Sequence, residues 1–110
     1  MVKPDSWEQV CAEVVARIVR RFRPEQIILF GSHARGTATA DSDLDFLVVL
    51  PANGSKRKQA AEIYGLLAGI GRPKDVVVVT PDEVARYRNV AGTVVRTALT
   101  EGRVLYERPA

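Results

Sequence analysis

Cysteine is nearly absent from this chain of 110 residues, which contains Cys11 and no other. One cysteine cannot form an intrachain disulfide, so a disulfide-stapled fold is excluded and a reducing, cytoplasmic location is expected. The sequence also lacks a membrane-spanning apolar run and a signal-peptide pattern, so no membrane partner is expected. A net charge of +3 gives little reason to expect a nucleic-acid partner. The length favours a single domain over residues 1–110.

Two common ligand-binding motifs are missing as well. Residues 31–36 have the glycine spacing of a P-loop, but Thr37 stands where that motif requires lysine. An EF-hand loop beginning at Asp41 would need glycine where Phe46 stands. Neither a P-loop nor an EF-hand is therefore expected.

A short glycine-bounded turn, Gly-Ser-His-Ala-Arg-Gly, follows a buried strand predicted over residues 25–30. Gly31 and Gly36 at the ends of the turn allow its backbone to approach an anion closely. The backbone amides, the Ser32 hydroxyl and the Arg35 guanidinium are donors suited to a triphosphate. The turn is therefore predicted to bind phosphate groups.

Two aspartates begin the next predicted strand, which runs from Asp43 to Leu50. Because side chains alternate along a strand, Asp43 and Asp45 project from one side, and their charges repel without a cation. Asp75 begins a third apolar strand. If this strand runs parallel to the Asp43 strand, and the strand over 25–30 antiparallel, the turn and all three carboxylates meet at one sheet edge. Magnesium favours such ligands and adds phosphate and water, so a metal shared with a nucleotide is predicted.

Capping and stop signals predict helices around these strands. The helices are expected between Ser6 and Pro24, between Ser55 and Gly71, and between Thr80 and Gly102, with a short edge strand over residues 103–106. This order predicts an α/β (α+β) domain with a small mixed sheet flanked by helices. His33 is the only histidine, and we expect it to be exposed or to lie behind the site rather than act as ligand or base.

The glycine turn, the pair Asp43 and Asp45, and the later Asp75 together resemble the signature of the DNA polymerase β-like nucleotidyltransferase superfamily. The small size points to its minimal nucleotidyltransferase (MNT) branch. The resemblance implies the polymerase β-like fold, ATP as substrate and two Mg²⁺ or Mn²⁺ ions. It implies a nucleotide-binding role for Gly31, Ser32, Arg35 and Gly36, and a catalytic and metal-binding role for Asp43, Asp45 and Asp75.

The implied reaction transfers a nucleoside monophosphate, AMP from ATP, to a hydroxyl group, and Asp75 is the candidate for taking its proton. Larger relatives carry a further domain that shapes the acceptor pocket, and we expect a partner to supply that wall here. The resemblance implies a HEPN-type helical ribonuclease toxin, whose tyrosine accepts AMP, with this chain as antitoxin. Two alternatives stay open. The chain neutralises the toxin by binding alone, or it modifies a small hydroxyl compound such as an aminoglycoside, as a homodimer.

Overall fold

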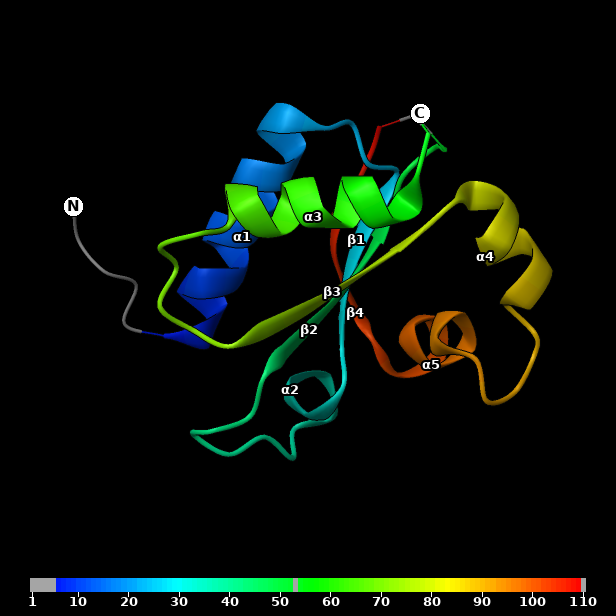
Figure 1. Cartoon of the computed structure of the whole chain (residues 1–110). Coiled ribbons are helices and arrows are strands. Elements are labelled where there is room, and N and C mark those ends of the chain that lie inside the picture. The colour runs from blue at the N-terminus through cyan, green and yellow to red at the C-terminus, as the bar shows by residue number, and fades with distance from the viewer. Residues whose placement is uncertain (1–5, 53, 110) are drawn as a thin grey trace.

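The computed structural model describes residues 6–52 and 54–109, and Figure 1 shows a twisted sheet with helices on both of its faces. The elements follow in the order α1 (Trp7–Arg21), β1 (Gln26–Phe30), α2 (Ser32–Arg35), β2 (Leu44–Val49), α3 (Lys56–Leu66), β3 (Lys74–Val79), α4 (Pro81–Tyr87), α5 (Val94–Glu101) and β4 (Arg103–Glu107). This mixed α/β architecture confirms the predicted fold class. The predicted domain bounds, 1–110, extend at both ends beyond the described residues. Among the helices that the structure describes, none has the length and apolarity needed to cross a membrane.

The strands form one sheet in the order β3-β2-β1-β4. β1 pairs antiparallel with β2 and β4, whereas β2 pairs parallel with β3. Parallel pairing requires the chain to cross over one face of the sheet between the two strands, and α3 makes this crossover. The predicted strand directions and the predicted edge strand at residues 103–106 are confirmed.

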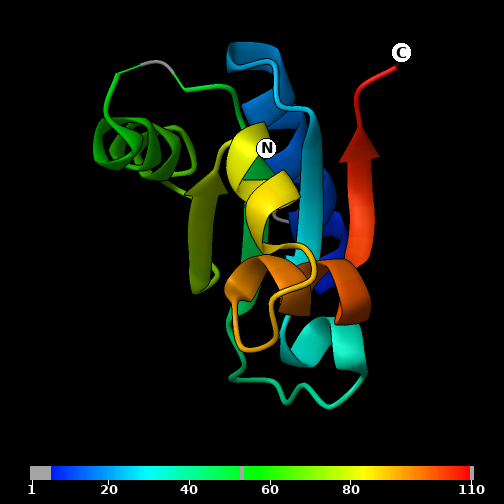
Figure 2. The same ribbon diagram turned by 90° about the vertical axis from the view of Figure 1, so that its right-hand side faces the viewer.

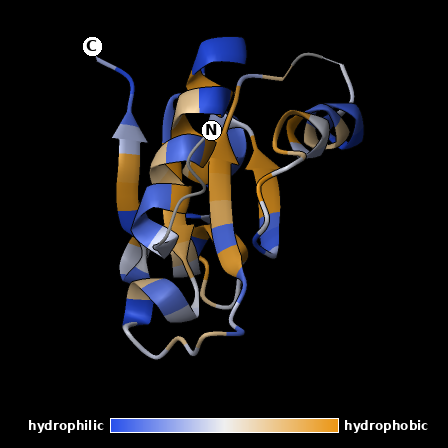
Figure 3. Ribbon diagram, turned by 90° about the vertical axis from the view of Figure 1, so that its left-hand side faces the viewer, coloured by the Kyte–Doolittle hydropathy of each residue, from blue (hydrophilic) through white to orange (hydrophobic). Residues whose placement is uncertain are grey.

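Two apolar cores cover the two faces of the sheet. The core under α1 and α3 includes the buried side chains Val14, Ile18, Phe46, Ile63 and Leu67. The core under α5 consists of Ile28, Leu47, Val49, Val79, Val95 and Ala98, with α4 packed against it through Val84 and Tyr87. Figure 2 shows α4 and α5 in front of the sheet with α1 behind it, and Figure 3 shows the strands as largely hydrophobic segments. Successive residues of β2 therefore belong to opposite cores.

Reciprocal capping boxes begin α1 and α4, as the sequence predicts. The Ser6 hydroxyl accepts from the N–H of Gln9 at 3.1 Å, and the Gln9 side chain accepts from the N–H of Ser6 at 3.2 Å. Thr80 and Glu83 form the same pair of bonds at the start of α4, at 3.1 and 3.0 Å. Each box satisfies backbone donors that have no partner within the helix, and so fixes where the helix begins.

The prediction of a single helix between residues 80 and 102 is wrong, because α4 ends at Tyr87 and α5 begins at Val94. Gly92 has a φ of +86°, a left-handed conformation that interrupts a right-handed helix. Thr93 then begins a new helix, since its side chain accepts a backbone N–H bond from the first turn of α5. The break lets α4 and α5 lie at an angle to each other on the same face of the sheet.

The second predicted helix also ends earlier than expected. α3 stops at Leu66 and does not reach residue 70. The Arg17 guanidinium of α1 donates to the carbonyls of Leu66 and Ala68 at 3.2 and 3.1 Å, and Gly69 has a φ of +88°. A cation at a helix C-terminus satisfies carbonyls that lack helical partners. Arg17 of α1 therefore helps to fix the position at which α3 ends.

Candidate functional site

The glycine turn and the three aspartates lie at one end of the sheet. Phe30, the last residue of β1, pairs with Asp45 of β2, and Asp45 pairs with Asp75 of β3. Asp43 immediately precedes β2, and the turn that forms α2 immediately follows β1. The pairing expected from the sequence therefore brings together the segments that carry all the predicted site residues.

Asp45 and Asp75 also share a face of the sheet. The neighbours of Asp45 along β2, Leu44 and Phe46, are buried in the core under α1 and α3. Val76, which follows Asp75, is buried in that same core. Because side chains alternate, both aspartates point to the opposite face, the one that α5 covers. Asp45 is half-buried, whereas Asp75 is exposed.

Gly31 is required at its position for two separate reasons. Its φ of +78° lies in the left-handed region, where a side chain is strained. A Cβ built on Gly31 would also overlap a carboxylate oxygen of Asp45. The turn and the Asp45 carboxylate are therefore in direct contact, and a residue with a side chain would separate them.

The turn itself is a single helical turn bounded by glycines. α2 covers Ser32–Arg35, and the N–H of Gly36, which has a φ of +79°, bonds to the Ser32 carbonyl. Four residues carry only a small helix dipole. The hydroxyl of Ser32 and the guanidinium of Arg35 are consequently the stronger hydrogen-bond donors that this turn offers to an anion.

The carboxylates repel one another in the free protein. Burial raises the pKa of Asp45 above its ordinary value, and the charges of Asp75 and Asp43 raise this pKa further, while His33 and Arg35 oppose them. Within residues 6–52 and 54–109, no three acidic, histidine or cysteine side chains are grouped tightly enough to enclose a metal ion. The donor set still fits a hard divalent cation, because magnesium commonly takes one or two carboxylates and completes its shell with phosphate and water.

Arg35 has a partner that the sequence did not reveal. Its guanidinium lies 3.7 Å from a carboxylate oxygen of Glu101, in the last turn of α5, and both side chains are about half exposed. The two residues are distant in sequence and carry no shared local pattern. Only the packing of α5 beside the sheet end brings them together, so sequence reasoning had no signal for this contact.

His33 is not exposed, contrary to one of the two expectations for it. The residue is 6% exposed, and its ring lies 5.0 Å from that of Trp7 between centroids. Its Nε2 atom lies 3.3 Å from the carbonyl oxygen of Ser42 and 3.3 Å from Nη2 of Arg72. The turn is thus attached on its inner side to α1 and to two loops.

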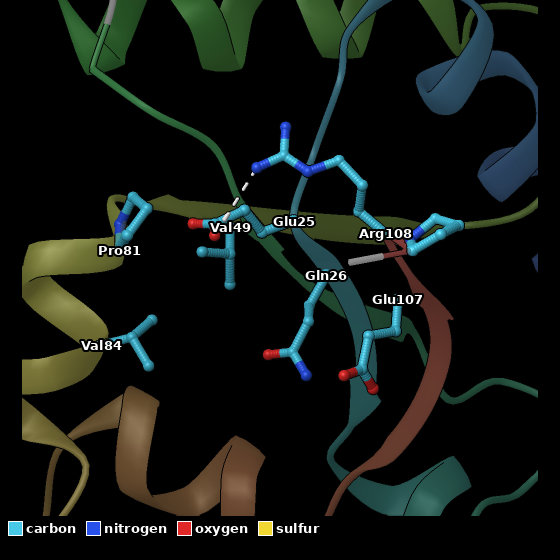
Figure 4. Close-up of a pocket in the computed structure, with 8 residues that line it drawn as sticks. Glu25, Gln26, Val49, Pro81, Val84, Glu107 and Arg108 are labelled. Carbon is cyan, nitrogen blue, oxygen red and sulfur yellow. Dashed lines mark ion pairs between the residues drawn. The ribbon is translucent and has the colours of Figure 1, made fainter.

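A cavity of about 440 Å³ lies at the opposite end of the sheet (Figure 4). It is lined by Glu25, Gln26, Val49, Pro81, Val84, Glu107, Arg108 and Pro109. β1 begins and β2 ends at this cavity, whereas the glycine turn follows the end of β1. Arg108 and Glu25 form an ion pair of 3.6 Å beside it. The cavity therefore includes none of the predicted site residues.

A mixed sheet that carries a glycine turn and strand-borne carboxylates at one end is the arrangement of a nucleotide-transferring α/β domain. The sequence profile of the nucleotidyltransferase domain family matches residues 11–105, and the chain belongs to this family. The matched range begins in α1 and ends in β4, so it includes every predicted site residue. The match shows a nucleotidyltransferase domain.

Among solved structures, the chain is similar to a provisionally assigned nucleotidyltransferase from Sulfolobus solfataricus. The TM-score is 0.59 at 22% sequence identity, and the alignment covers 91% of this chain and 79% of the other. At this identity the similarity shows the fold, which agrees with the predicted nucleotidyltransferase fold. No curated protein matches the chain.

Proposed function

We propose that this domain is a metal-dependent nucleotidyltransferase of the MNT branch. It transfers AMP from ATP to a hydroxyl group, and the acceptor is a tyrosine of a HEPN-type helical toxin that the domain neutralises. The observation that carries the proposal is the register that pairs Phe30 with Asp45 and Asp45 with Asp75. Phosphate-binding and carboxylate groups are thereby delivered to one end of the sheet.

In this proposal the glycine turn holds the triphosphate. The Ser32 hydroxyl and the turn amides donate to phosphate oxygens, and the Arg35 guanidinium neutralises their charge. Arg35 must exchange Glu101 for phosphate, and both partners are about half exposed. Exposed ion pairs contribute about 1 kcal/mol or less, so this exchange opposes nucleotide binding only weakly.

Asp43, Asp45 and Asp75 would supply carboxylate oxygens to two divalent cations, Mg²⁺ or Mn²⁺, and phosphate and water would complete the shell of each. When bound, the cations would neutralise charge on the phosphates and on the attacking and leaving oxygens. The raised pKa of Asp45 supports this assignment, because it reflects burial and repulsion that a bound cation would offset.

The transfer itself is one displacement at the α-phosphorus. The acceptor oxygen forms a new bond to phosphorus, the bond between the α-phosphorus and the bridging oxygen breaks, and pyrophosphate leaves with the electron pair. The hydroxyl proton passes to the Asp75 carboxylate. Because Asp43 and Asp75 are exposed, a hydroxyl carried on the surface of another protein can reach them.

The test is label transfer from α-labelled ATP with Mg²⁺, with and without a helical partner encoded beside this chain. Label is expected on the partner, and it should disappear with the Asp43→Asn/Asp45→Asn variant. Asp82→Asn is the matched control, because Asp82 is an exposed aspartate of α4 outside the site. This control should transfer label as the wild type does.

The other outcomes identify the alternatives. A stable complex that silences the partner without label would mean neutralisation by binding, and would contradict the catalytic proposal. Label on an added aminoglycoside, and none on protein, would show that the acceptor is a small hydroxyl compound and not a tyrosine.

A further inference from the structure

We propose that His33 is a positioning residue of this site, which fastens the phosphate-binding turn to the two segments that deliver Asp43 and Asp75. The inference rests on the proposed function and assigns a role to a side chain that touches neither the nucleotide nor the acceptor. Its basis is the set of contacts that the imidazole makes on the inner side of α2.

The first contact is with the segment before β2. Nε2 of His33 lies 3.3 Å from the carbonyl oxygen of Ser42, the residue that precedes Asp43. The loop around Ser42 is itself ordered by short-range bonds, because the Ser42 hydroxyl accepts from the N–H of Thr39 at 2.9 Å. A bond to this carbonyl therefore connects the turn to a structured segment rather than to a loose one.

The second contact is with the segment before β3. Nε2 of His33 lies 3.3 Å from Nη2 of Arg72, and Asp75 follows three residues later. The carbonyl of Arg72 accepts from the Lys74 ammonium at 3.1 Å. The N–H of Leu44 bonds to the carbonyl of Pro73 at 3.1 Å, so the two carboxylate segments are already connected to each other. A hydrogen bond between His33 and either segment therefore attaches the glycine turn to both of them.

The bond to a carboxylate segment does not depend on which tautomer His33 adopts. With Nε2 unprotonated, the ring accepts a hydrogen bond from Arg72. With the proton on Nε2, the ring donates to the carbonyl of Ser42. The Trp7 ring, 5.0 Å away and tilted by 52°, closes the other side of the imidazole. The ring is therefore held in one place in both forms.

The turn needs this attachment because α2 buries little apolar surface of its own. It is four residues long, and only Ala34 and His33 face the interior. Group transfer is sensitive to the position of the reacting groups, and a misplacement of about 1 Å can cost about 10²-fold in rate. Loss of the His33 bonds should shift Ser32 and Arg35 relative to the aspartates without unfolding the sheet.

The experiment compares His33→Leu, which keeps the bulk, with His33→Gln, which keeps a donor and an acceptor near the position of Nε2. Val49→Ala is the destabilising control, because Val49 is buried at the end of β2, beside the cavity at the opposite end of the sheet. Amide hydrogen exchange is measured on each protein, together with kcat and KM for label transfer. His33→Leu should increase exchange in residues 31–36 and also in 39–44 or 70–74, whichever segment the Nε2 bond reaches, and lower kcat by about 10- to 100-fold.

His33→Gln should restore both readouts to within about threefold of the wild type, and Val49→Ala should leave kcat of the folded protein unchanged. Unchanged exchange in both segments of His33→Leu, residues 39–44 and residues 70–74, would overturn the positioning role. Equal behaviour of the leucine and glutamine variants would overturn it too, because bulk alone would then explain the effect. If the wild type transfers no nucleotide, the proposed function fails, whereas hydrogen exchange still decides the role of His33.

Discussion

Asp45 lies in surroundings that disfavour its charged form. Burial and the charges of Asp75 and Asp43 raise its pKa in the folded state. A carboxyl whose pKa is higher in the folded state than in the unfolded state destabilises the fold once ionised. Its favourable contribution is present below the unfolded pKa and is lost as the pH rises through the folded pKa. At neutral pH the ionised Asp45 therefore opposes folding.

Asp45→Asn should accordingly raise the melting temperature by a few degrees at pH 7 in the absence of divalent cations, while abolishing transfer. The gain should shrink toward zero at about pH 3, where the wild-type carboxyl is protonated. Thermal unfolding followed by circular dichroism in EDTA measures the effect. A lower melting temperature of the variant at pH 7 would show that Asp45 stabilises the free fold.

Gly31→Ala should destabilise the protein by about 1–3 kcal/mol, because the backbone is strained and the new methyl group overlaps Asp45. Gly54→Ala is the control, since Gly54 has a φ of +77° but no atom within 4 Å of its Cβ position. Gly54→Ala introduces the backbone strain alone and should therefore lose less stability than Gly31→Ala. Urea unfolding gives both values, and equal losses would mean that contact with Asp45 contributes nothing.

At the scale of elements, alanine substitutions at Gly65 and Gly102, which both have ordinary φ angles, should change the free energy of unfolding in opposite directions. Gly65 lies in α3 with open space around it, so Gly65→Ala should stabilise by about 0.5–1 kcal/mol. Gly102 joins α5 to β4, and a Cβ there would overlap the backbone carbonyl of Ala98 and the side chain of Ile28. Gly102→Ala should therefore destabilise by about 1–3 kcal/mol. Urea midpoints that move in the same direction would contradict this packing.

The starts of α3 and α4 are joined by an ion pair of 2.7 Å between Lys56 and Glu83. The hydrogen bond from Lys56, followed by that from the Thr80 backbone, lowers the pKa of Glu83. Its contribution to stability is present above the unfolded pKa and is lost as the pH falls through the folded pKa. Glu83→Gln should cost about 1 kcal/mol at pH 7, since Lys56, its partner, is about half exposed and water screens the pair, and almost nothing at about pH 3. A cost that is equal at both pH values would exclude the ionic contribution.

At the scale of the whole molecule, local signals predicted most of the architecture. The capping residues Ser6 and Thr80, and the aspartates at the strand starts, act within a few residues of themselves. The break between α4 and α5 also has a local signal, because Gly92 adopts a left-handed conformation that a continuous helix excludes, and Thr93 caps the next helix. The helical spacing of the apolar residues Val90, Val94, Val95, Ala98 and Leu99 favoured the prediction of one continuous helix.

Contacts between distant segments could not be predicted in this way. Arg35 meets Glu101 only because α5 packs beside the sheet end, and the His33 ring meets Trp7 of α1 and Arg72 only through tertiary packing. The sequence therefore identified the groups of the candidate site through their places on strands and turns. The residues that hold those groups in position depend on tertiary packing and required the structure.

We expect the glycine turn and the three aspartates to form one cation-dependent nucleotide site. Isothermal titration calorimetry with an ATP analogue that carries a methylene group between its α- and β-phosphorus atoms tests this most directly. Binding should require Mg²⁺ or Mn²⁺, should weaken at least about tenfold in Asp43→Asn/Asp45→Asn, and should be unchanged in Asp82→Asn. Equal binding without a divalent cation, or equal binding by the double variant, would show that these residues do not form a cation-dependent nucleotide site.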